Sequence, residues 1–315
     1  MQKTHPVKKV TNPFKSTTKV STKTTTKVVT TPSKLSGGFR PQVRSRHPSH
    51  DRLRTMLPKL PFRSIVRFGS TTEVNDNFRR VEVNPTSSIK NSSNKLLMKE
   101  CFKKASVKTA DWFLLRQGTF INQQNNANTA VEELPYPIVA KKNFGSRGEG
   151  NTLIETLDDM KVFLKKNSTQ ETSFVFEKYY SYSKEYRLHI TADGCFYTNR
   201  KRLKKETPEA DRWYINDHNC VWFLEESPEF EKPSCWKSII EESVKALKSV
   251  GLDVGAVDVR VQNETSAKGT KRKSVDFIII EINSAPSFGE GTLTKYLNEL
   301  PRVLKNKFVT NNEQV

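Results

Sequence analysis

The uneven distribution of charge along the chain is the feature that most limits what it can fold into. Residues 1–62 carry 14 lysines and arginines against one acid, Asp51, which is +13 of the net +19 of the whole 315-residue chain. Residues 1–60 consist largely of Thr, Lys, Ser and Pro with scattered valines. Such a segment buries too little apolar surface to offset the entropy lost on ordering. We therefore expect residues 1–60 to be a disordered basic tail, with the fold beginning at residue 61.

A tail of like charge attracts polyanions, and nucleic acid is the first partner that we expect for residues 1–60. The tail is poor in the aromatic residues on which bases stack, since Phe14 and Phe39 are its only two. Two alternatives remain open: a solvated extension without a partner, and an organelle transit peptide, because the segment is Ser-rich and acid-poor.

The remaining 253 residues hold 39 basic and 33 acidic residues, as in a mildly basic globular protein. Their apolar runs, such as 277–280, are far shorter than the roughly 20 residues of a membrane span. The N-terminus lacks the apolar stretch of a secretory signal, and the four cysteines form no C-x-x-C pair. We expect a cytoplasmic protein without a membrane partner.

Strand and helix patterns mix from residue 61 onward without regular alternation, which predicts an α+β fold. The polar stretch 69–93 reads as a loop, and residues 309–315 as a disordered C-terminus. We expect strands over 64–68, 111–115, 136–141, 173–180, 184–191 and 195–201, a hairpin of 254–261 with 275–282, and helices over 94–105, from 156, over 236–250 and from 292.

Residues 138–151, IVAKKNFGSRGEGN, place two lysines at the end of an apolar strand and three glycines shortly after. Glycines let backbone N–H groups close around an anion, and a strand-end lysine supplies a charge for phosphate. The segment matches neither the Walker A nor the dinucleotide motif. Taken alone it fits a flexible turn better than a phosphate site.

Carboxylates mark the expected C-terminal hairpin. Glu281 and Asn283 are two residues apart, so their side chains leave one face of the strand, and Asp258 on the partner strand can lie opposite them. Oxygen ligands of this kind suit Mg²⁺ bound to phosphate, whereas a solvated polar face is the alternative. Likewise Glu177, Glu185 and Arg187 could hold a ribose and a phosphoryl group, or form a surface salt-bridge ladder.

In order, these motifs resemble the ATP-grasp carboxylate–amine ligases, over about 95–297. The resemblance is carried by NK at 94–95, KKNFGSRGEG, EKY followed by EYR, VDV and EINSAP. It is nearest to the ligases that add glutamate to ribosomal proteins, including phage-encoded relatives. If this chain is phage-encoded, we expect it in a host cytoplasm or on a virion. It implies subdomains over 93–178 and 179–308 that grip the nucleotide, after a shortened preceding domain at 61–92.

The resemblance also implies roles for individual residues. Lys95 and Lys141 would bind the ATP phosphates, under a loop containing Ser146, Arg147 and Gly148. Glu177, Lys178 and Tyr179 would meet adenine, and Glu185 the ribose. One or two Mg²⁺ ions would be held by Asp258, Glu281 and Asn283. The transferred phosphoryl group or the substrate carboxylate would face Arg187, Arg200 and Lys201.

The chain departs from the family's pattern on the strand that carries Asp258. D-Alanine-type ligases carry an arginine two residues before the metal aspartate, and Ala256 stands there in this chain. Arg187 or Arg200 would have to stabilise the acyl phosphate instead. The implied activity is amide formation between a carboxylate and an amine through that intermediate. The alternatives are a catalytically inactive protein of the same fold, tethered by its tail to nucleic acid or a viral particle, and a small-molecule kinase.

Overall fold

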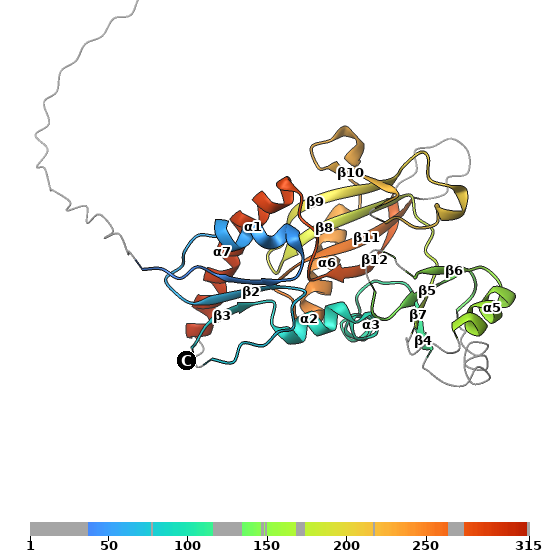
Figure 1. The fold of residues 1–315 in the computed structure, drawn as a ribbon. Coiled ribbons are helices and arrows are strands. Elements are labelled where there is room, and N and C mark those ends of the chain that lie inside the picture. The colour runs from blue at the N-terminus through green and yellow to red at the C-terminus, as the bar shows by residue number, and fades with distance from the viewer. Residues whose placement is uncertain are drawn as a thin grey trace, which may run out of the picture. The chain divides into compact units, whose positions relative to one another are not determined.

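The computed structural model describes residues 37–315 with the exception of 77, 116–133, 146–147, 149, 168–173, 217, 264–273 and 314–315. The described part contains three sheets with their covering helices, as Figure 1 shows in chain order. The mixed α+β class expected from the sequence is confirmed. None of the described helices combines the length and the apolar character that a membrane span requires.

A three-stranded parallel sheet comes first, in the order β1-β2-β3. Its apolar side chains pack against a long C-terminal helix, α7, which supplies Tyr296, Leu300 and Leu304 to the same buried cluster. The elements are β1 (Gln42–Ser45), α1 (Asp51–Met56), β2 (Ser64–Phe68), β3 (Val81–Val83), α2 (Thr86–Ser93) and α7 (Glu290–Glu313).

This sheet corrects three boundaries expected from the sequence. Residues 37–60 are folded, because Val43, Leu53 and Leu57 are buried against partners that come from far along the chain. The stretch 69–93 contains β3 and α2 rather than a continuous loop. The C-terminal helix runs past residue 309 to Glu313, which leaves little of the expected disordered end.

The second sheet is antiparallel, with four strands in the order β4-β7-β5-β6. Helix α5 covers it with Met160, Phe163 and Leu164. A capping box starts this helix: Thr156 Oγ1 accepts from the Asp159 amide at 3.1 Å, and Asp159 Oδ2 accepts from the Thr156 amide at 2.9 Å. The elements are β4 (Trp112–Leu115), β5 (Ile138–Lys142), β6 (Thr152–Ile154), α5 (Leu157–Asn167) and β7 (Phe174–Lys178).

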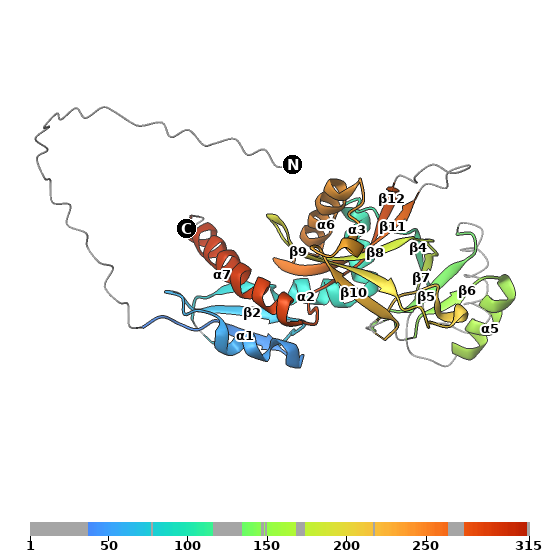
Figure 2. The ribbon, with the colours of Figure 1, turned by 90° about the horizontal axis from the view of Figure 1, so that it is seen from above.

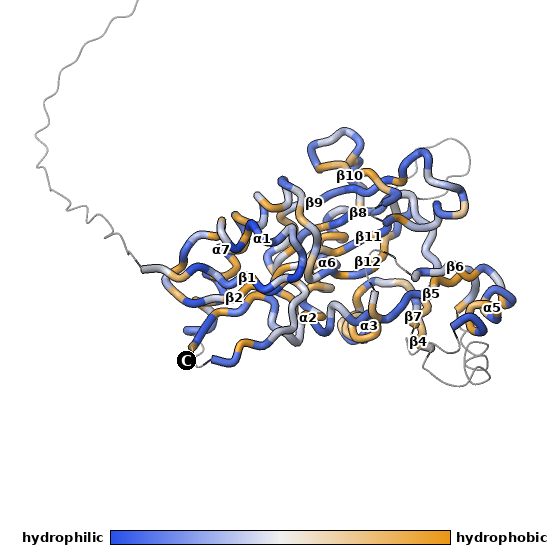
Figure 3. Tube along the Cα trace, viewed as in Figure 1, coloured by the Kyte–Doolittle hydropathy of each residue, from blue (hydrophilic) through white to orange (hydrophobic). Residues whose placement is uncertain are grey.

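The third sheet has five antiparallel strands in the order β10-β9-β8-β11-β12. One of its faces lies under α3 and α6, and Figure 2 shows α6 crossing it. Figure 3 shows apolar residues along α6 and the strands beneath it. The elements are α3 (Lys95–Lys104), β8 (Lys184–Thr191), β9 (Gly194–Leu203), β10 (Cys220–Leu224), α6 (Trp236–Val250), β11 (Val254–Asn263) and β12 (Ser274–Asn283).

Asn84 joins the first sheet to the third. It is fully buried, and its φ of 58° is a left-handed conformation that asparagine tolerates better than most residues. Its side-chain Nδ2 donates to the carbonyls of Arg67 and Val254, and its Oδ1 accepts from the backbone amides of Asp253 and Val254. All four distances are 3.1 Å or shorter. The start of β11 is thereby fixed to the end of β2.

Candidate functional site

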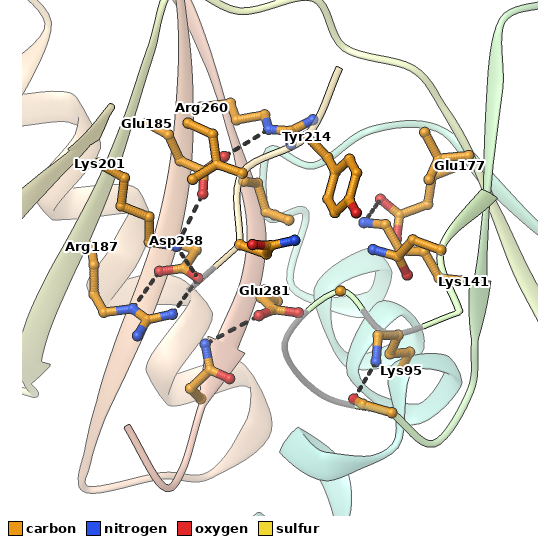
Figure 4. A pocket seen from close by; sticks show the side chains of 18 of the residues that line it. Lys95, Lys141, Glu177, Glu185, Arg187, Lys201, Tyr214, Asp258, Arg260 and Glu281 are labelled. Carbon is orange, nitrogen blue, oxygen red and sulfur yellow. Dashed lines mark hydrogen bonds and ion pairs between the residues drawn. The ribbon is translucent and has the colours of Figure 1, made fainter. Parts of the chain in front are cut away.

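A cavity of about 280 Å³ is lined by residues of the second and third sheets. The second sheet contributes Lys141 and Glu177, and the third contributes Glu185, Arg187, Asp258 and Glu281 (Figure 4). Lys95, at the start of α3, also lines it. Thirteen of the candidate site residues that the sequence predicts belong to the described part of the chain. The cavity brings these eleven of them together: Lys95, Lys141, Gly148, Glu177, Lys178, Glu185, Arg187, Lys201, Asp258, Glu281 and Asn283.

Glu177 holds two lysines at the second-sheet side of the cavity. Its Oε2 lies 2.9 Å from Lys141 Nζ and 3.2 Å from Lys99 Nζ. Burial alone would raise the pKa of Glu177, but the two ammonium groups outweigh it and lower that pKa to about 2. Lys99 is fully buried and also donates to Thr109 Oγ1 at 2.7 Å. Glu177 is thus a fixed anion between two cations.

Lys95 is positioned by the cap of α3. Asn94 Oδ1 accepts from the Leu97 amide at 3.0 Å, and Asn143 Oδ1 accepts from the Leu96 amide at 2.9 Å. The Lys95 ammonium donates to the Gly145 carbonyl at 2.7 Å, so it touches the glycine-rich segment. Burial lowers the pKa of Lys95 from its ordinary value, which is consistent with a cation short of counter-charge.

The glycine-rich segment bends at Gly148 and Gly150, whose φ values are +74° and +73°. A side chain at Gly148 would meet the Tyr214 ring at 3.5 Å, so this segment approaches a loop that follows β9. Of the three loop residues expected to close over phosphate, Gly148 lines the cavity, whereas Ser146 and Arg147 lie outside the described residues.

A continuous ion-pair network covers the third-sheet side. Arg187 binds Asp258 in a bidentate pair, with Nε to Oδ1 at 2.7 Å and Nη2 to Oδ2 at 2.8 Å. Lys201 Nζ lies 2.9 Å from Asp258 Oδ2 and 3.0 Å from Glu185 Oε1. Arg260 Nε completes the network at 3.0 Å from Glu185 Oε2. Burial would raise the pKa of Asp258, but Arg187 and Lys201 reverse the effect and keep it below its usual range.

The oxygen ligands expected for Mg²⁺ lie together. Asp258 and Glu281 are register partners across β11 and β12, and Asn283 Nδ2 donates to Glu281 Oε1 at 3.3 Å. Asp258 Oδ2 accepts two hydrogen bonds and Oδ1 accepts one, so Oδ1 keeps a lone pair. These residues fit a hard cation held by Glu281, the Asn283 amide oxygen and Asp258 Oδ1. Within the described ranges no group of three or more His, Cys, Asp or Glu side chains could hold a metal. The set described here has two carboxylates and one amide.

The position of Arg200 differs from the one expected from the sequence. It pairs with Tyr186 in the register of β8 and β9, one residue out of phase with Lys201, so it points to the opposite face of the sheet. Its Nη1 lies 2.9 Å from Glu231 Oε2, and it does not line the cavity. The prediction that Arg200 faces the site is therefore wrong, and Arg187 and Lys201 remain.

Tyr179 does not line the cavity, whereas its neighbours Lys178 and Tyr180 do, and its contact with adenine stays a prediction. The backbone amides of Lys178 and Tyr179 donate at 2.9 Å to the carbonyls of Asp111 and Pro137. These two amides are therefore engaged within the protein.

A second cavity, of about 410 Å³, shares Arg187 and Ser287 with the first. Trp222 lines it, and its ring lies 5.2 Å from the Arg187 guanidinium and 5.3 Å from Lys201 Nζ. Arg187 is its only charged residue among those described. The other lining residues are His189, Tyr197, Asn199, Leu224, Gly289, Gly291 and Thr292.

The structure adds residues that sequence reasoning missed. Lys99 lies one helical turn after Lys95, and that spacing was an available signal. Arg260 is two residues after Asp258 on β11, so its side chain had to share the same face. Tyr214 also lines the cavity, and it belongs to residues 202–234, a charged and aromatic segment that the sequence indicates for the acceptor side.

Comparison with solved structures identifies the architecture. D-Alanine–D-alanine ligase from Bacillus anthracis is similar over 88% of this chain and 100% of its own, with a TM-score of 0.57 and 14% identity. The structure of the same ligase in complex with ATP is similar over 74% of this chain and 72% of its own, with a TM-score of 0.52 and 15% identity. The chain has the ATP-grasp fold.

Carboxyaminoimidazole ribonucleotide synthase from Aspergillus clavatus, complexed with ATP, is also similar, with a TM-score of 0.51 and 18% identity over 71% of this chain. This chain spans about half of that protein, 53%. No protein-family model and no curated protein matches the sequence. At these identities the ATP-grasp fold is established, and the function must be argued from the cavity.

Proposed function

We propose that the chain is an ATP-dependent carboxylate–amine ligase. The observation that carries the proposal is that Lys95 and Lys141 line the same cavity as Asp258 and Glu281. Such an arrangement offers cations to phosphate oxygens and hard oxygen ligands to Mg²⁺. A bound Mg²⁺ would neutralise charge on the β- and γ-phosphates and would be held by Glu281, Asn283 and Asp258 Oδ1.

The proposed reaction has two steps. A substrate carboxylate oxygen attacks the γ-phosphorus of ATP, the bond from that phosphorus to the β–γ bridging oxygen breaks, and ADP leaves. An amine then attacks the acyl carbon, phosphate leaves, and the nitrogen loses a proton to give the amide. Lys95 and Lys141 would stabilise charge on the transferring group, and Gly148 belongs to the segment that would exclude water.

The carboxylate substrate is assigned to the second cavity. Arg187 lines both cavities, so it would place a carboxylate where the two spaces meet. Trp222 and Leu224 offer an apolar wall for the rest of that substrate. Because Arg187 is the only charged residue among the described ones that line this cavity, it suits one carboxylate better than a strongly acidic peptide.

Nucleotide binding is tested by thermal denaturation with MgATP and with ATP plus EDTA. A ligand at 100 times its Kd stabilises the folded state by about 2.7 kcal/mol, and we expect a metal-dependent shift. Lys141→Ala and Glu281→Ala should remove it. Lys142→Ala is the matched control, because Lys142 is adjacent on β5 and does not line the cavity.

Ligation is tested by ADP release across a panel of carboxylates and amines, with mass spectrometry of the product. Release that requires both substrates supports a ligase, and release with a carboxylate or alcohol alone indicates a kinase. A metal-dependent shift without any turnover would favour the inactive ATP-grasp protein. No shift with MgATP would contradict the whole proposal.

A further inference from the structure

The edge strand β1 presents a row of polar side chains. Gln42 and Arg44 on β1, and Arg40 and Arg46 just beyond its two ends, are exposed, whereas Val43 is buried. Successive side chains on one face of a strand are about 6.6 Å apart. Since β1 is the first strand of a three-stranded sheet, this row lies along an edge with no neighbouring strand among the described residues.

The end of the row opens into a cavity of about 280 Å³, separate from the two described above. Arginines and hydroxyl groups dominate its lining, which is the chemistry of a phosphate site. Arg46 makes no hydrogen bond or ion pair with any described residue, and Arg44 makes one long bond, to Gln42 Oε1 at 3.4 Å. Arg54 is engaged by Asp51 at 2.7 Å and by the Ser45 carbonyl at 2.8 Å. The lining residues are Val43, Arg44, Ser45, Arg46, Arg54, Ser70 and Thr72.

The other end of the row carries exposed aromatic rings. The Arg63 guanidinium lies 4.6 Å from the centroid of Phe39 and 4.1 Å from that of Phe78. Phe39 is 39% exposed and Phe78 is 56% exposed. Exposed rings of this kind are sites on which a nucleic-acid base can stack.

The sequence that contains the row and precedes it carries charge of mostly one sign. Residues 37–63 contain seven lysines and arginines and a single acid, Asp51, and residues 1–36 add eight lysines and no acid. The folded row therefore continues the basic segment that precedes it in the chain. An excess of this size over a short length favours a polyanion rather than one small anion.

We propose that the β1 row binds single-stranded nucleic acid, with phosphates along Arg44 and Arg46 and a base against Phe39. A single strand fits better than a duplex, because a stacked ring needs an unpaired base. This function is independent of the proposed ligase chemistry, since Arg44, Arg46 and Phe39 do not line the ATP cavity. It also extends the sequence-based expectation, which assigned nucleic acid only to a disordered tail.

The test measures binding of a fluorescent single-stranded oligonucleotide to the full-length protein by polarisation at several salt concentrations. Neutralising Arg44 and Arg46 with Gln should reduce the slope of log K against log salt by about 1.4, or roughly 0.7 for each phosphate contact of a single strand. Lys103→Gln with Lys104→Gln removes the same charge from an exposed end of α3 and should leave the slope nearly unchanged.

Phe39→Ala separates nucleic acid from polyanions in general. Base stacking of about 1–3 kcal/mol corresponds to a five- to 150-fold loss of affinity, without a change in salt slope. Heparin binding should not respond to Phe39→Ala. An unchanged slope in the arginine variant, or an equal reduction in the lysine control, would overturn the assignment to β1. Loss of oligonucleotide and heparin binding to the same extent in Phe39→Ala would overturn the nucleic-acid class.

Discussion

The buried lysine at position 99 offers the sharpest test of the site. Its ammonium lies 3.2 Å from Glu177 Oε2 and is fully buried. Breaking a buried ion pair costs about 3–5 kcal/mol, because one charge stays buried without its partner. Lys141 remains 2.9 Å from the same oxygen and offsets a part of this cost. We therefore expect Lys99→Met to lower the free energy of unfolding by about 2–3 kcal/mol.

Urea denaturation of a double-mutant cycle isolates the pair. Glu177→Gln should restore a part of the stability lost in Lys99→Met, because the excess negative charge then disappears, although Lys141 loses its partner. Lys103→Met is the matched control, since Lys103 is exposed on the same helix. A loss below about 1 kcal/mol for Lys99→Met, or the same loss with and without Glu177→Gln, would refute the reasoning.

Three further results are expected. Asn84→Ala should cost about 2–4 kcal/mol in denaturant because it removes up to four buried hydrogen bonds, whereas Asn91→Ala, which loses one bond at 3.2 Å, should cost less. Burial lowers the pKa of His189 to about 3. Its buried neutral form therefore costs no stability above pH 6.5, and the folded state loses stability as the pH drops from 6.5 toward 3. Denaturation midpoints measured between pH 7 and 4 should fall less steeply for His189→Leu than for the parent protein. If the ligase proposal holds, Trp222→Ala should raise KM for the carboxylate with little change in KM for ATP, as ADP-release kinetics would measure.

The elements with strong local patterns could be predicted from the sequence. Helix α6 was expected over 236–250 and has those bounds, with Gly251 at a φ of 79° as its C-cap. The pairing of Asp258 with Glu281 followed from alternation on a hairpin in which apolar residues flank both carboxylates. In both cases the residues that determine the structure are close in sequence, or are joined by antiparallel register.

The failures have a common physical cause. Residues 42–57 look too polar to fold. Leu53 and Leu57 are nevertheless buried, in one cluster with residues of α7 that lie about 240 positions later in the sequence. Arg200 and Lys201 look equivalent in sequence, and only the register of β9 decides which one faces the cavity. Burial supplied by distant partners, and the phase of a strand with polar residues on both faces, are not visible in a local window.

The Asn84 junction has a practical consequence for anyone who shortens the chain. Because the same side chain bonds to the end of β2 and to the start of β11, the parallel sheet and the strand that carries Asp258 should unfold as one cooperative unit. Amide hydrogen exchange should then show the same degree of protection in both regions. Deleting residues 1–60 would remove β1 and α1 from that unit, whereas a start at residue 37 would keep it whole.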